Sequence, residues 1–188
     1  MVGVLDKKQI EQNIQNHVTY EEAMAKIKRA GLFIPKKPLD IIKGVDLFVE
    51  WENVKSKYGG VANIPFFDLG DFLDRWTNMI AYARWTEAIA DVEQATAREI
   101  KDNIKKQIYT LQEGNREIRD ALVYCEPLYV EWQIKFNESY TRYTLIKALR
   151  EGYEQRAAAI SREITRRSSD VIDTRRIINR GDGRLNNC

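Results

Sequence analysis

Residues 128–178 carry the strongest structural signal in the chain, LYVEWQIKFNESYTRYTLIKALREGYEQRAAAISREITRRSSDVIDTRRII. Counted as a heptad from Tyr129, positions three and four residues apart form a seam with only three polar members. The seam consists of Tyr129, Trp132, Phe136, Ser139, Tyr143, Ile146, Arg150, Tyr153, Ala157, Ile160, Ile164, Arg167 and Val171. This spacing predicts one long helix over residues 128–178 with a coiled-coil-like seam.

A second long helix is predicted over residues 69–111, a stretch without proline, and Asp68 is placed to cap it. Its apolar residues recur at helical spacing, at Phe72, Trp76, Met79, Tyr82, Trp85, Ile89 and Val92. Gly114-Asn115 marks a turn, and a short helix is expected over residues 116–124. The two long helices should therefore fold back on each other as an antiparallel hairpin.

Two shorter helices are expected ahead of this hairpin, over residues 20–30 and 39–57. Thr19 opens the pattern T-Y-E-E, a capping box, and Gly31 is placed to end the first helix. The second should stop at Gly59-Gly60.

The pattern as a whole predicts an all-α, elongated protein in three parts. These are a short-helix region over residues 1–65, the long hairpin over 66–178 and a flexible tail over 179–188. The apolar seams of two helices of this length are longer than the front region can cover. Pairing the helices in a hairpin still leaves one apolar stripe exposed on each helix. Because the seam is rich in Tyr, Trp and Arg, as interface centres are, we expect a homo-oligomer.

Composition favours a folded protein that does not enter a membrane. Hydrophobic residues make up 44% and charged residues 31% of the chain, and no apolar run approaches the roughly 18 to 20 residues that a spanning helix requires. The N-terminal sequence MVGVLDKKQIEQNIQNH lacks the features of a secretory signal. We expect a cytoplasmic protein.

The residues needed for common catalytic sites are missing from the sequence. His17 is the single histidine, which argues against histidine-based metal clusters and against histidine-assisted nucleophiles. Cys125 stands beside Glu126, which disfavours the thiolate, and we expect this cysteine to be packed or partly buried. No phosphate-binding glycine motif is present. We therefore expect neither an enzyme nor a cofactor or metal.

A basic cluster late in the helix over 69–111 is the first candidate binding site. It consists of Arg98, Lys101, Lys105 and Lys106, with Tyr109 one turn further on. Basic side chains interleaved with an aromatic ring can follow a phosphate backbone and stack a base. The alternative is a solvated helix face in which Glu99 and Asp102 pair with the cations.

Arginines near the C-terminus form a second candidate, at positions 156, 162, 166, 167, 175 and 176. Their forked side chains suit phosphate and carboxylate equally. They either contact nucleic acid or pair with acidic residues of a neighbouring subunit. Arg150 and Arg167 lie on the seam itself. The sequence leaves both readings open.

The order of features over residues 76–170 resembles the recombination mediator proteins of T4-like phages, the UvsY family. A long helix contains Tyr-x-x-Trp at residues 82–85 and a basic stretch at 101–109. A turn, a short helix and a second long helix follow, with R-x-x-x-I-x-x-x-I at residues 156–164. Residues 1–65 have no counterpart in this resemblance.

The resemblance implies a small helical protein that forms a ring-like oligomer and binds single-stranded DNA. It also implies help in loading a RecA-like recombinase onto strands covered by single-strand-binding protein. By position, the DNA contacts fall to Arg98, Lys101, Lys105 and Lys106, and oligomerisation falls to Tyr153, Ile160 and Ile164. Arg167, on the same seam, is a fourth candidate for oligomerisation.

Two other classes of function compete with this one. A structural or scaffolding protein, for instance of a virus particle, would self-assemble without binding DNA. A partner-binding adaptor would use the front helices around Trp51.

Overall fold

The computed structural model describes residues 20–182, and within that range helices are the only regular secondary structure and no strand is present. The helices are α2 (Tyr20–Arg29), α3 (Leu39–Ile42), α4 (Leu47–Tyr58), α5 (Phe66–Leu111), α6 (Arg116–Cys125) and α7 (Pro127–Asp182), with a 3-10 turn, η1 (Val61–Asn63), before α5. The all-α prediction is confirmed. His17 and Thr19 lie outside the described residues.

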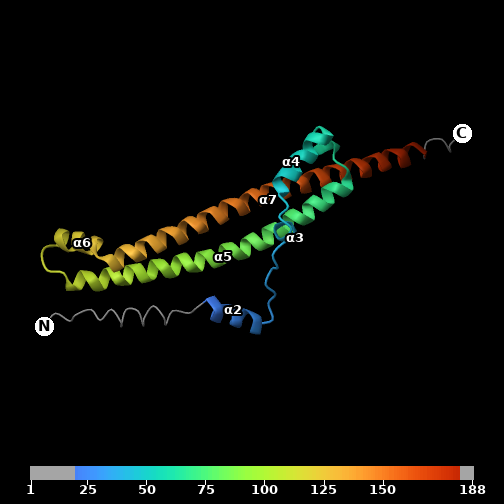
Figure 1. Cartoon of the computed structure of the whole chain (residues 1–188). Helices are drawn as coiled ribbons and strands as arrows, with labels where there is room; N and C mark the ends of the chain where they lie inside the picture. The colour runs from blue at the N-terminus through green and yellow to red at the C-terminus, as the bar shows by residue number, and fades with distance from the viewer. Residues whose placement is uncertain (1–19, 183–188) are drawn as a thin grey trace. The chain divides into compact units, whose positions relative to one another are not determined.

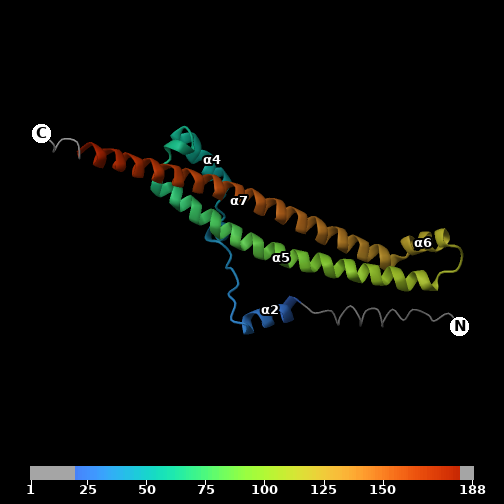
Figure 2. The same ribbon diagram turned by 180° about the vertical axis from the view of Figure 1, so that it is seen from behind.

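The predicted hairpin of long helices is also confirmed, because α5 and α7 run antiparallel, side by side, in both views (Figures 1 and 2). Helix α5 begins at Phe66, and the Leu69 amide donates to the Pro65 carbonyl at 3.1 Å. Asp68 therefore lies inside the first turn, and its predicted capping role is wrong. Helix α7 extends to Asp182, four residues beyond the predicted end at 178, and residues 183–188 of the predicted tail lie outside the described residues.

The single helix expected over residues 39–57 is divided in two. Gly44 adopts the left-handed conformation with φ of 69°, which ends α3, and Asp46 then caps α4. The Asp46 carboxylate accepts from the amides of Phe48 at 3.0 Å and Val49 at 3.2 Å. Apolar spacing continues across this break, so periodicity alone does not reveal it.

The chain forms two compact units, and both long helices contribute to each of them. Among the described residues, the first unit contains 20–35 and 83–148, and the second contains 36–82 and 149–182. Within residues 20–182 no helix is both long enough and apolar enough to cross a membrane.

The core of the first unit joins the end of α5 to α6 and to the start of α7. Its buried residues are Ile100, Ile104, Ile108, Val123 and Tyr129, with Tyr109, Leu128 and Trp132 packed around them. Burial raises the pKa of the Tyr129 phenol. These contacts fix the turn of the hairpin and hold α6 against it.

The core of the second unit is larger and more aromatic. It contains Leu47, Trp51, Ile64, Leu69, Phe72, Trp76, Met79, Ala157 and Ile160. Trp51 and Phe72 pack edge to face with ring centroids 5.0 Å apart, and Trp51 is only 4% exposed. An adaptor surface around Trp51 would therefore have to open this core.

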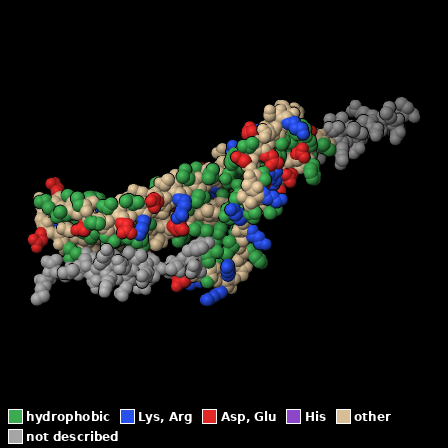
Figure 3. All heavy atoms as spheres, viewed as in Figure 1, with side chains coloured by type: hydrophobic (Ala, Val, Ile, Leu, Met, Phe, Trp, Pro, Cys, Tyr) green, Lys and Arg blue, Asp and Glu red, His purple; other side chains and the backbone are tan. Residues whose placement is uncertain are grey.

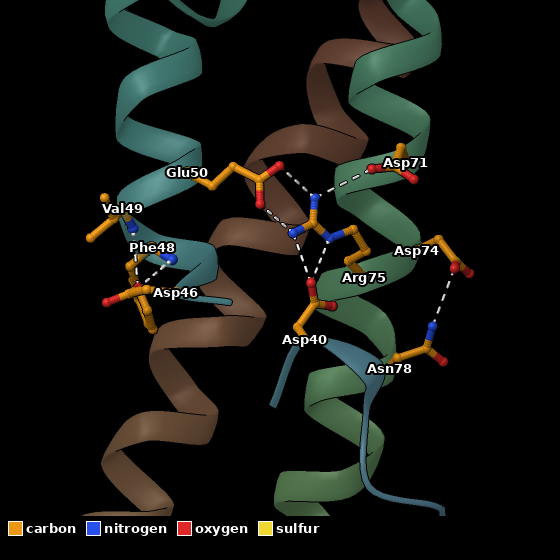
Figure 4. Close-up of polar contacts among 9 residues, drawn as sticks. All are labelled: Asp40, Asp46, Phe48, Val49, Glu50, Asp71, Asp74, Arg75 and Asn78. Carbon is orange, nitrogen blue, oxygen red and sulfur yellow. Dashed lines mark hydrogen bonds and ion pairs between the residues drawn. The ribbon is translucent and has the colours of Figure 1, made fainter. Parts of the chain in front are cut away.

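An ion-pair cluster around Arg75 ties α3 and α4 to α5 in the second unit (Figure 4). The guanidinium lies 2.7 Å from Asp40 and also donates to Glu50, at 2.9 Å from Nη1. Asp71, one turn earlier on α5, lies at 3.5 Å. Hydrogen bonding to Arg75 lowers the pKa of Glu50, and the carboxylates in turn raise the pKa of Arg75.

The predicted seam of α7 is the helix face that packs inside the chain. Its members from Tyr129 to Arg167 are buried or half-buried, whereas Val171 is 52% exposed. Val171 lies one turn beyond Arg167, the side chain that reaches η1. The seam is thus used by the chain itself over most of its length.

Candidate nucleic-acid interface

Lys101 of α5 is packed against α7 and does not point freely into solvent. Its side chain is only 15% exposed, and its ammonium lies 4.4 Å from the centroid of the Phe136 ring. Asp102 lies 3.5 Å from the same ammonium. Lys101 therefore combines a cation–π contact with an ion pair.

Lys105 is held by α6. Its ammonium donates to the Tyr124 hydroxyl at 3.0 Å, lies 4.9 Å from the centre of that ring and is 3.9 Å from Asp120. The hydrogen bond to Tyr124 is the main reason that the pKa of Lys105 is raised. Since an ammonium has three donors, Lys105 retains the capacity to contact a phosphate.

Arg98 and Lys106 are exposed and line a polar groove of about 480 Å³ on α5. Glu99 and Asp102 line the same groove, and the Arg98 guanidinium lies 4.0 Å from Asp102. The groove therefore shows the local ion pairing expected of a solvated helix face. Two of these four side chains are basic and two are acidic.

Tyr109 is half-buried at the end of α5, and Arg119 of α6 covers its ring at 5.7 Å. Arg119 is anchored by donating to the Gly114 carbonyl at 2.8 Å. A fourth cation–aromatic contact joins Lys135 and Trp132 on α7, at 4.3 Å. The first unit thus pairs cations with aromatic rings on α5, α6 and α7.

The structure divides the predicted cluster into two groups. Lys101 and Lys105 pack against aromatic rings, whereas Arg98 and Lys106 line the groove. We call the four contacts Lys101–Phe136, Lys105–Tyr124, Arg119–Tyr109 and Lys135–Trp132 the cation–aromatic set. Sequence reasoning missed the α6 and α7 members of this set. Only the Lys135–Trp132 pair has a local signal, its spacing along one helix.

The residues predicted for oligomerisation lie in the core of the second unit. Ile160 is fully buried, and Ile164 packs against the same cluster. The Tyr153 ring lies 5.6 Å from Phe48 and 5.7 Å from Trp76, and burial raises its pKa. These three residues stabilise the chain's own fold.

Arg167, the fourth predicted oligomerisation residue, fastens α7 to the segment that precedes α5. It donates to the carbonyls of Ile64 at 2.6 Å and Val61 at 2.9 Å, and to Glu163 at 2.8 Å. Hydrogen bonds from Arg166 and then Arg167 lower the pKa of Glu163 to about 2. Arginines at the end of the seam therefore find acidic and carbonyl partners within the chain.

Replacing Arg167 with leucine is expected to lower the free energy of unfolding by about 1–3 kcal/mol, because the Val61 and Ile64 carbonyls lose their charged donor. Urea unfolding followed by circular dichroism measures this loss. The control is Arg162→Leu on an exposed position of the same helix, which should change stability little. Equal stability of the two variants would contradict the anchoring role. Sedimentation of Arg167→Leu tests whether this arginine also pairs with a neighbouring subunit, since an unchanged assembly would argue against that pairing.

The chemistry available in the described residues is that of cations and aromatic rings. Within residues 20–182 no group of three His, Cys, Asp or Glu side chains is placed to hold a metal ion. Cys125 is exposed at the end of α6, so the expectation that it is packed or partly buried is wrong. Comparisons with protein-family models, with curated proteins and with solved structures found no match.

Proposed function

We propose that the protein is a non-enzymatic recombination mediator of the cytoplasm. It binds single-stranded DNA as a homo-oligomer and promotes loading of a RecA-like recombinase onto DNA covered by single-strand-binding protein, in recombination, repair and replication. The order of motifs over residues 76–170, with its resemblance to the UvsY family, supports this function. The cation–aromatic set in the same part of the chain is compatible with it.

The observation that carries the proposal is the contact between Lys105 and Tyr124. The Tyr124 side chain is 53% exposed, and Lys105 holds it by a hydrogen bond to the hydroxyl. Proteins that bind single strands without sequence preference combine cations along the backbone with rings on which bases stack. A base stacked on Tyr124 would place its phosphate near Lys105.

Binding by one chain should be weak, and this suits a mediator. The net charge is only +2, and acidic and basic side chains are interspersed on the face drawn in Figure 3. Repeating a weak site around an oligomer raises the overall affinity by multivalency. Individual sites can then be released one at a time to an incoming recombinase.

The test is fluorescence anisotropy of a labelled single-stranded oligonucleotide at about 50 and 200 mM salt, where counterion release should weaken binding as salt rises. Changing Lys101, Lys105 and Lys106 to alanine is expected to abolish most of the binding. The matched control changes Lys36, Lys43 and Lys57, three exposed lysines of the second unit, to alanine. Equal loss in both triple variants would contradict the assigned site.

Two variants of Tyr124 separate stacking from charge. Tyr124→Ala removes the ring and should weaken binding by about 1–3 kcal/mol, the range for one stacked base. Tyr124→Phe keeps the ring and removes only the acceptor for Lys105, so most of the affinity should remain. A phenylalanine variant as weak as the alanine variant would argue against stacking.

A structural or scaffolding protein is the second candidate, favoured by exposed apolar side chains on α7. Ile134 is 52% and Leu145 is 60% exposed. Such side chains indicate surfaces for protein partners. A chain that assembles and yet binds no single-stranded DNA at low salt would support the scaffold and exclude the mediator.

A further inference from the structure

The side of α7 that faces away from the core carries a second helix-packing face within the first unit. It consists of Val130, Ile134, Asn137, Thr141, Leu145 and Ala148, at steps of three and four residues. At 3.6 residues per turn these positions lie opposite the seam members Tyr129 to Ile146. Val130, Ile134 and Leu145 are 40%, 52% and 60% exposed. We call these six residues the outer face.

We propose that the outer face binds the outer face of a second copy of this chain, with the two α7 helices antiparallel about a twofold axis near residues 139 and 140. The spacing of the outer face is close to symmetric about that point, since Val130 and Ala148 are each nine residues from position 139, and Asn137 and Thr141 are each two residues from it. Ile134 of one copy then lies opposite Leu145 of the other, and Val130 lies opposite Ala148. A twofold interface requires this self-complementarity.

The two polar members of the outer face lie at its centre and can set the register. Asn137 accepts from Gln133 at 2.9 Å through its side-chain oxygen, which leaves its NH2 group as a donor. In the antiparallel pair this donor lies opposite the Thr141 hydroxyl of the second copy, and the contact occurs twice. A polar residue within an apolar helix interface fixes register in coiled coils.

Charges beside the outer face select the antiparallel orientation. Glu138 and Arg142 flank it on one side, and the twofold axis places Glu138 opposite Arg142 of the second copy. A parallel pair would instead bring this flank against the opposite flank of the second copy, so Glu138 and Arg142 would not meet. Arg142 forms an ion pair with Glu93 of α5, and its side chain is 56% exposed. A guanidinium can hold two carboxylates, as Arg75 does in the second unit.

A shallow, open groove on the surface of α7 lies at the centre of the outer face. This groove of about 500 Å³ is lined by Asn137, Glu138, Thr141, Arg142, Leu145 and Ile146. In the proposed pair Ile134 of the second copy enters this groove beside Leu145. The apolar contacts, the central polar pair and the flanking charges place the twofold axis at points within one residue of each other, between positions 139 and 140.

This inference uses only one part of the proposed function, the self-association of the chain. It assigns self-association to the outer face and not to Tyr153, Ile160 and Ile164. Those side chains are engaged in the core of the second unit. DNA binding plays no part in the argument. The test therefore measures the mass of the assembly formed by the full chain without DNA. A failure of the dimer proposal can then be distinguished from a failure to bind single-stranded DNA.

Sedimentation of the full chain should give at least twice the mass of one chain. Changing Ile134 and Leu145 together to glutamate should raise the dissociation constant roughly 100-fold or more, since charges without partners would be buried in the pair. Val92→Glu is the matched control, because Val92 is 56% exposed on α5 of the same unit. This control should leave the mass unchanged.

Charge reversal tests the orientation. Glu138→Arg alone should weaken the pair, and Arg142→Glu alone should do the same. The double variant Glu138→Arg with Arg142→Glu should restore association, because the opposite charges meet again across the axis. Failure of the double variant to associate more tightly than both single variants would exclude the antiparallel arrangement.

A disulfide keeps the proposal testable if the glutamate variant does not fold. Asn137→Cys with Thr141→Cys, in a chain that also carries Cys125→Ser and Cys188→Ser, should form a covalent dimer on mild oxidation. No interchain bond would overturn the proposal. A wild-type chain that sediments as a monomer would overturn it too, and would leave the outer face to a different protein or to residues 1–19 of the same chain.

Discussion

Replacing Trp76 with alanine is expected to lower the free energy of unfolding by about 3–5 kcal/mol, the range for truncating a buried aromatic side chain. Trp76 is fully buried in the core of the second unit. Its ring packs edge to face on Phe48 at 5.0 Å and lies 5.7 Å from Tyr153. The cavity would therefore open where α4, α5 and α7 meet.

Urea unfolding of the full chain, followed by circular dichroism, measures this effect without relying on tryptophan fluorescence. Phe67→Ala is the matched control, since Phe67 lies on the same helix and is 84% exposed. Trp76→Phe should cost less than the alanine variant, because the indole Nε1 has no hydrogen-bond partner to lose. If Trp76→Ala and Phe67→Ala had equal stability, the aromatic core would not be what holds the second unit together.

Arg156 shows how a residue singled out for charge can have a different role. Its guanidinium lies 4.4 Å from the centre of the Phe48 ring and 5.8 Å from that of Trp76, and it donates to the Gly152 carbonyl at 3.1 Å. The sequence left this arginine between phosphate contact and subunit pairing. Its stem and guanidinium instead cover an aromatic core, a contact that spacing along one helix does not reveal.

The long helices and their hairpin were predictable because their signal is local and repeated. Apolar residues at helical spacing and turn residues between helices are sufficient to place α5, α6 and α7. The break at Gly44 was missed because a glycine inside an apolar pattern has two readings, a tolerated helix residue or a helix end. Only the left-handed backbone there and the cap at Asp46 decide between them.

The candidate site was predictable only in part, for a different reason. The basic residues of α5 are close in sequence, but the partners that orient Lys101 and Lys105 come from other helices. Tyr124 and Phe136 entered no sequence argument about binding, since their proximity to these lysines depends on tertiary packing. The division of one basic cluster into a packed group and a groove follows from that packing.

Replacing Arg75 with methionine is expected to lower the free energy of unfolding by about 3 kcal/mol at neutral pH, the lower end for breaking a buried ion pair. Methionine keeps most of the apolar length and removes the charge. Asp40, whose side chain is only 14% exposed, would then be left without its cation, whereas Glu50 at 41% and Asp71 at 56% remain open to water. Asp71→Asn is the control, because this most exposed contact should contribute little.

Acidification supplies an independent readout of the same cluster. Because Arg75 lowers the pKa of Glu50 in the folded state, the contact stabilises the fold fully above the ordinary value of 4.5 and is lost as pH falls through the lowered pKa. The wild type should lose stability over that window more steeply than Arg75→Met, so the difference between them should shrink. The difference in free energy of unfolding between the two proteins could instead stay constant from neutral to acid pH. Arg75 would then stabilise the second unit by packing and not through these carboxylates. Its guanidinium lies 5.2 Å from the centre of the Phe72 ring, which would allow such packing.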